Sequence, residues 1–123
     1  QTETGSAFVI NALIESDQVE TLKGSPVAIM TATESGRGQQ VWRCPECHVA
    51  LWSNYGGAKD LLRFVRVGTL DQPGDVEPDI HIYTRSKLPW VRLPEGALAV
   101  EAYYDSSEVW PAESLERRKA LFG

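Results

Sequence analysis

The feature that most constrains this chain is a pair of cysteines separated by two residues, Cys44-Pro45-Glu46-Cys47, in a sequence with no other cysteine. A disulfide across so short a loop would remove little entropy from the unfolded chain, so a secreted scaffold held by disulfides is disfavoured. We therefore expect a cytoplasmic protein in which both thiols stay reduced.

A Cys-x-x-Cys pair has three common roles, and its flanks help to distinguish them. A redox pair needs its first cysteine at the start of a helix, where the helix dipole stabilises the thiolate. Here both flanks are strand-like, at residues 39–43 and 49–52, and Pro45 indicates a tight turn. In a zinc knuckle such a turn brings both sulfurs onto one ion, and backbone N–H groups of the turn hydrogen-bond to them. Two incidental buried thiols are the third alternative; the pattern favours the knuckle, with Cys44 and Cys47 as zinc ligands.

A structural zinc site has four ligands, so two more must be found. The other soft ligands of the chain are His48 and His81. His48 follows Cys47 directly, which predicts a side chain pointing away from the knuckle, and His81 lies in an alternating, strand-like segment. We therefore expect the remaining ligands to come from a segment outside this chain or from a partner. The first six residues contain neither an initiator Met nor a signal-peptide pattern, and we expect a native segment to precede Gln1.

The rest of the sequence predicts a single β-rich domain with a helix at its end. The length of 123 residues and the 42% hydrophobic content suit one globular domain. A C-terminal helix is predicted from Pro111, with Leu115, Leu121 and Phe122 on its apolar face and acidic residues ahead of basic ones. A short helical turn is predicted at 100–104. Strands are predicted at residues 7–14, 19–22, 27–33, 39–43, 49–52, 61–70 and 80–84, with an extended segment at 89–94.

Composition also excludes some partners. The net charge of −5 disfavours nucleic acid, whose phosphates require a cationic surface. No apolar run approaches the roughly 20 residues of a membrane span. Basic side chains in strand-like segments form either a patch for a small anion or ordinary solvated faces: Arg63, Arg66, Arg85, Lys87 and Arg92.

Several motifs resemble, in order, those of one enzyme family. They are Gln-Thr-Glu-Thr-Gly-Ser-Ala-Phe at 1–8, Lys-Gly-Ser-Pro at 23–26, the knuckle at 41–47, Val-Gly-Thr-Leu-Asp at 67–71, Pro-Asp-Ile-His-Ile-Tyr at 78–83 and Ser-Lys-Leu-Pro-Trp at 86–90. Together they resemble the glutathione-dependent formaldehyde-activating enzymes. The resemblance implies a mainly β, Mss4-like β-tent of antiparallel sheets with a zinc knuckle and a C-terminal helix. Residues 1–123 would form the C-terminal two-thirds of the family's domain.

The resemblance also implies a chemistry, that of a zinc-dependent carbon–sulfur lyase joining glutathione and formaldehyde reversibly. The family's N-terminal part carries a Cys-x-Cys that completes the structural zinc, and a Cys-x-Cys-x-x-Cys that holds the catalytic zinc. By alignment, the last catalytic cysteine would stand immediately before Gln1. Cys44 and Cys47 would then belong to the structural zinc, and no residue of this chain matches a catalytic metal ligand.

The resemblance further implies contacts with an anionic, glutathione-like thiol. Gly5 and Ser6 would lie beside the catalytic zinc, and His81, Arg85, Lys87 and Trp90 are further candidates. We expect this chain by itself to be inactive and to bind at most about one zinc ion. The alternatives are a catalytically silent zinc-fold binding module and a truncated fragment stabilised as a homodimer.

Overall fold

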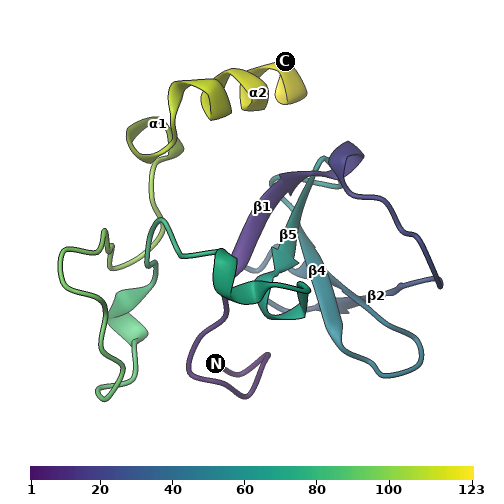
Figure 1. The fold of residues 1–123 in the computed structure, drawn as a ribbon, viewed down its shortest axis with the longest axis horizontal. Coiled ribbons are helices and arrows are strands. Elements are labelled where there is room, and N and C mark those ends of the chain that lie inside the picture. Colours follow the sequence, from purple (N-terminus) through teal and green to yellow (C-terminus); the bar gives the residue numbers. More distant parts are fainter. The chain divides into compact units, whose positions relative to one another are not determined.

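The computed structural model describes residues 1–123, which divide into two compact units (Figure 1). The sheet unit is Val9–Val76, and the terminal unit combines Gln1–Phe8 with Glu77–Gly123. Compactness alone does not make either unit an independently folding domain, so the single domain over residues 1–123 stays a prediction. The chain contains no helix that is long and apolar enough to cross a membrane.

The sheet unit is built on one antiparallel sheet of five strands in the order β1-β5-β4-β3-β2 (Figure 1). The strands are β1 (Asn11–Glu15), β2 (Val27–Thr31), β3 (Gln39–Arg43), β4 (Ala50–Tyr55) and β5 (Leu62–Arg66). The three hairpins β2–β3, β3–β4 and β4–β5 follow one another, and β1 closes the order by pairing with the last strand. The predicted β-rich, antiparallel fold is confirmed.

The strand bounds follow the available partners. β3 has its predicted bounds, and β2 ends two residues before the predicted limit of residue 33. β1 begins only at Asn11, because Asn11 is the first residue that pairs with β5, opposite Arg66. The strand predicted at 19–22 is wrong: no strand forms there, and Leu22 is 88% exposed.

The predicted long strand at 61–70 is also wrong in its second half. β5 ends at Arg66, and the chain turns into the 3-10 helix η2 (Val67–Thr69). The Thr69 hydroxyl donates to the Arg66 carbonyl oxygen (2.7 Å), and Val67 is almost fully buried. The turn thus places an apolar side chain in the core where a straight strand would have continued.

A buried polar network ties the three strands β1, β5 and β4 together. Arg66 is only 7% exposed, and its guanidinium donates to the Ser53 hydroxyl (3.0 Å) and to the Asn11 amide oxygen. Ser53 is itself fully buried. Because a buried charge is costly without partners, these hydrogen bonds offset part of the cost of burying Arg66, whose Nε has no partner.

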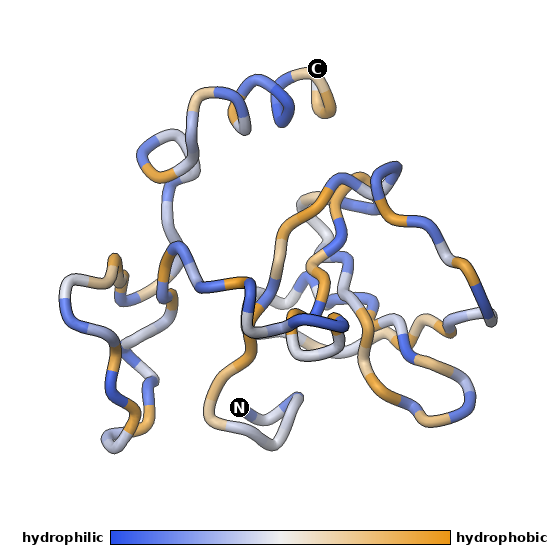
Figure 2. The backbone as a smooth tube through the Cα atoms, viewed as in Figure 1, coloured by the Kyte–Doolittle hydropathy of each residue, from blue (hydrophilic) through white to orange (hydrophobic).

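The terminal unit contains the helices α1 (Ser106–Val109) and α2 (Ala112–Phe122). The predicted C-terminal helix is confirmed as α2, which Pro111 precedes as its N-cap. Figure 2 shows α2 as predominantly hydrophilic, with apolar residues near its ends. The helical turn predicted at 100–104 is wrong: the Val100 N–H bonds to the His81 carbonyl oxygen, and the short helix forms after Asp105 instead.

The strand predicted at 80–84 is reduced to a single bridge. His81 pairs with Ala99 in a parallel bridge, and Tyr83 then adopts a left-handed conformation (φ 51°). The segment 89–94 contains a turn closed by Val91 N–H and the Leu88 carbonyl oxygen. The remaining 3-10 helices are η1 (Ser16–Gln18), η3 (Pro73–Asp75) and η4 (Thr84–Ser86).

Candidate metal centre

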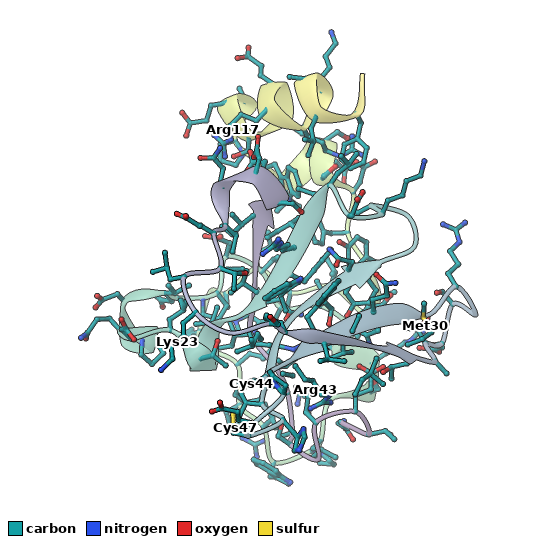
Figure 3. The ribbon with its side chains drawn as sticks, turned by 90° about the vertical axis from the view of Figure 1, so that its right-hand side faces the viewer. Lys23, Met30, Arg43, Cys44, Cys47 and Arg117 are labelled. Atoms are coloured by element: carbon teal, nitrogen blue, oxygen red, sulfur yellow. The ribbon has the colours of Figure 1, made fainter.

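Cys44 and Cys47 lie in the turn that joins β3 to β4 (Figure 3). Arg43 ends β3 and Ala50 begins β4, and these two residues face each other beside an irregularity in the register. The predicted strand–turn–strand hairpin is therefore present, and it carries both thiols at its tip.

Three hydrogen bonds fix the shape of this turn. The Cys44 N–H donates to the Val49 carbonyl oxygen (3.0 Å), and the His48 N–H donates to the Cys44 carbonyl oxygen (2.9 Å). The Arg43 guanidinium donates to the His48 carbonyl oxygen (2.9 Å). The backbone from Cys44 to Val49 is thus held in one conformation at both of its ends.

The turn provides hydrogen-bond donors to the sulfur of Cys44. The backbone N–H of Cys47, then that of Glu46, and then the Cys47 thiol lower the pKa of the Cys44 thiol, against the opposing effects of burial and the Glu46 charge. Cys44 is half-buried, Cys47 is exposed, and both are free thiols. N–H groups aimed at a sulfur stabilise its thiolate, which is the form that binds metal.

His48 has a left-handed backbone conformation with φ 63°, as the turn closes just beyond Cys47. This conformation favours glycine, because a Cβ atom is crowded there. The side chain of His48 is exposed. His48 therefore contributes to the knuckle through its backbone hydrogen bonds.

The structure does not join a further ligand to the pair. No group of three or more His, Cys, Asp or Glu side chains is arranged to hold a metal ion. His81 lies in the terminal unit, half-buried, with its backbone in the bridge to Ala99. Cys44 and Cys47 thus share one turn, and no third ligand completes a metal-holding group with them.

Four residues predicted to contact substrate, Ser6, His81, Arg85 and Trp90, belong to the terminal unit. So does Lys87, whose ammonium group donates to the Val91 carbonyl oxygen (2.9 Å). The Ser6 hydroxyl donates to the Phe8 carbonyl oxygen (3.0 Å), the Arg85 guanidinium lies 5.7 Å from the Tyr83 ring centroid, and Trp90 is 67% exposed. His81 lines a cavity of about 330 Å³ together with Glu77–Asp79 and Pro94–Leu98. That cavity does not include the other predicted contact residues, so their common role stays a prediction.

Sequence reasoning missed an aromatic arrangement next to the knuckle. Trp42 and Trp52 face each other across β3 and β4, and their rings stack at a centroid distance of 5.5 Å. Arg63 of β5 lies over the Trp52 ring. Pairing residues 42 and 52 across the predicted hairpin would have brought the two indoles together, whereas Arg63 required knowledge of the β4–β5 register.

The sequence also matches a known family. A family model described as glutathione-dependent formaldehyde-activating enzyme matches residues 1–86. The chain belongs to this family. No curated protein and no solved structure matches the chain. The glutathione-dependent formaldehyde-activating enzyme match includes the knuckle and also Ser6, His81 and Arg85, whereas Trp90, α1 and α2 lie beyond it.

The knuckle of this chain suits a soft divalent ion. Two thiols on one turn, one of them with a lowered pKa, are the donor set that Zn²⁺ takes from a knuckle. Two thiolates supply half of the four ligands of a structural site. The residues present therefore fit one half of such a site.

Proposed function

We propose that this chain is part of a zinc-dependent carbon–sulfur lyase that acts on an adduct of formaldehyde with glutathione or a similar thiol, and that Cys44 and Cys47 hold its structural zinc. Family membership supports the activity. The single observation that carries the zinc assignment is the hydrogen-bonded turn between β3 and β4, which holds both Cys44 and Cys47.

The proposed zinc is structural, and the residues of this chain hold it in position. A four-ligand zinc adds folding stability and leaves no open coordination position for substrate. Cys44 and Cys47 would supply two of its ligands, and two others would come from outside residues 1–123 or from a partner. Arg43 would keep the turn closed through its bond to the His48 carbonyl oxygen.

The proposed reaction adds a thiol to an aldehyde. The sulfur of the thiolate forms a bond to the carbonyl carbon of formaldehyde, the π bond of the carbonyl breaks, and the oxygen takes a proton. The thiolate is the reactive form. Arg85 would balance the negative charge of a glutathione-like substrate, and Ser6, His81 and Trp90 would contact it.

A catalytically silent binding module, or a fragment stabilised by dimerisation, is the second candidate function. It is favoured by the lack of any three-ligand group among the described residues. Both candidates predict the same result when the purified chain is mixed with glutathione and formaldehyde. We expect no acceleration over the spontaneous adduct from residues 1–123 alone, and clear turnover would contradict the ligand assignment.

The zinc proposal predicts the metal content of the chain. We expect at most about one zinc ion per chain. Cys44→Ser and Cys47→Ser should each abolish zinc binding, because the one thiolate that remains cannot hold the ion. Elemental analysis after dialysis measures zinc, and the absorption of a Co²⁺-loaded sample reports thiolate ligation.

The matched control is His81→Ala, which removes the other type of soft ligand and should leave the metal in place. Two zinc ions per chain, or unchanged zinc after loss of both cysteines, would contradict the proposal.

A further inference from the structure

A pocket of about 190 Å³ lies in the sheet unit. It is lined by Thr21, Pro26, Trp42, Trp52, Asn54, Asp60 and Arg63. Its volume is below the roughly 300–1,000 Å³ of sites for drug-sized ligands, so it suits a small molecule or the end of a larger one. None of its residues is among those proposed above to hold zinc or contact substrate.

The aromatic wall of the pocket is preorganised. The indoles of Trp42 and Trp52 are stacked with 17° between their planes. The Trp42 Nε1–H donates to the Asn54 amide oxygen (2.7 Å), and the Asn54 amide nitrogen donates to the Leu62 carbonyl oxygen (2.8 Å). Since these polar groups already have partners, Trp42 and Asn54 are held in place before a ligand binds.

Arg63 has a hydrogen-bond donor that the protein leaves unused. Its guanidinium carbon lies 4.3 Å from the Trp52 ring centroid, which holds the planar group against the indole. Its Nη1 atom is buried and has no hydrogen-bond partner. Leaving a buried charged donor unpaired is costly, and a carboxylate is the acceptor that matches a guanidinium edge.

Asp60 lines the same pocket and is exposed. A carboxylate in the same pocket as the guanidinium disfavours a ligand that is only anionic, and it favours one that also carries a cationic group. A pocket with one unused guanidinium donor and one carboxylate complements the zwitterion of an α-amino acid.

We propose that this pocket binds the α-amino-acid group of a small molecule, with its carboxylate on Arg63 Nη1 and its ammonium group toward Asp60. The further assignment of this group to the γ-glutamyl end of a glutathione-like thiol rests on the proposed function. The binding itself needs neither metal nor thiol.

The test is a titration of the metal-free chain with L-glutamate, followed by tryptophan fluorescence, since two of the four tryptophans line the pocket. Glutarate, which lacks the amine, is the comparison ligand. We expect a saturable change with L-glutamate that Arg63→Ala weakens at least about tenfold. Asp60→Asn should weaken the binding of L-glutamate and leave the binding of glutarate unchanged or tighter.

Arg37→Ala is the matched control, because Arg37 is exposed in the same unit and does not line the pocket.

Arg63→Lys keeps the charge and the aliphatic stem, so it covers the case in which Arg63→Ala does not fold; it too should lose most of the binding. No saturable change with L-glutamate, or equal binding by a folded Arg63 variant, would overturn the proposal. S-methylglutathione, which has no free thiol, should displace L-glutamate. If it does not, the assignment to the thiol substrate is overturned, whereas a failed zinc experiment leaves this result unchanged.

Discussion

His48 illustrates how a single backbone angle constrains a site. Its φ of 63° places it in the left-handed region, at the point where its own N–H bonds to the Cys44 carbonyl oxygen. A side chain with a Cβ atom is strained there by roughly 1 kcal/mol relative to glycine. The turn therefore requires a left-handed residue at this position and keeps the histidine there despite the strain.

Two substitutions separate the backbone of His48 from its imidazole. His48→Gly should raise the free energy of unfolding by up to about 1 kcal/mol, since it removes the left-handed strain. His48→Ala removes the imidazole and keeps the strain, so it should change stability little. Urea unfolding measures the first effect, and metal content should be unchanged in both variants. Loss of metal in both would make the imidazole a ligand.

At this scale the sequence predicted the turn that carries both cysteines but not the pocket. The spacing of Cys44 and Cys47 dictates that one turn carries both thiols, whatever the rest of the chain does. The contact of Arg63 with Trp52 depends instead on how β5 is aligned with β4, where Trp52 faces Val65 and Ser53 faces Phe64. Such an alignment is set by packing over the whole sheet, which no local pattern reveals.

Among the elements, α1 depends on its cap. Asp105 precedes Ser106, and its carboxylate accepts hydrogen bonds from the Ser107 N–H (2.8 Å) and the Ser107 hydroxyl (2.6 Å). The hydroxyl and then the N–H lower the pKa of Asp105, with help from the charge of Arg118 and against a small effect of burial. The sequence Asp-Ser-Ser-Glu at 105–108 is a helix-start pattern, so this element could have been predicted.

The cap predicts a pH dependence for α1. Because the pKa of Asp105 is lower in the folded chain, its contribution to stability is present above the unfolded value of about 3.9 and is lost as the pH falls through the folded value. The Ser107 amide resonance should follow this loss in an acid titration by NMR. Asp105→Asn keeps a capping oxygen that does not titrate, so its Ser107 resonance should stay constant over the same range. An identical titration in this variant would refute the cap.

Strand prediction failed where a segment had the alternating pattern but its backbone did not stay extended. Residues 80–84 alternate as a strand does, and the N–H groups of His81, Tyr83 and Thr84 bond to the carbonyl oxygens of Leu98, Ala102 and Val100. Tyr83 is left-handed (φ 51°), however, so only His81 forms a bridge, with Ala99. Conversely, β4 extends to Tyr55 through Asn54, a residue typical of loops, because Asn54 is buried and bonded to Trp42 and Leu62.

For the whole molecule, the open edges of the sheet matter most. β1 and β2 are the outer strands, and β2 has the sequence Val-Ala-Ile-Met-Thr, without a charge or a proline. Its apolar residues are exposed, Met30 to 67%. An uncharged apolar edge is a template for pairing with another chain.

We therefore expect the chain to self-associate through β2. Ile29→Lys should shift it toward monomer, since a charge on an edge strand opposes pairing with a second copy. Leu22→Lys makes the same chemical change at a more exposed residue outside the strand and should have little effect. Sedimentation velocity over a range of concentrations measures the shift. A wild-type chain that is monomeric throughout would contradict this expectation.

The buried guanidinium of Arg66 has a consequence for how the sheet is assembled. In an antiparallel sheet, a slip of β5 by one residue would carry Arg66 to the opposite face, away from Asn11 and Ser53. The misaligned chain would then bury a cation without its acceptors or expel it into water, and either state is disfavoured. The hydrogen bonds of the buried Arg66 to Ser53 and to the exposed Asn11 thus disfavour alternative strand alignments that an all-aliphatic interior would tolerate.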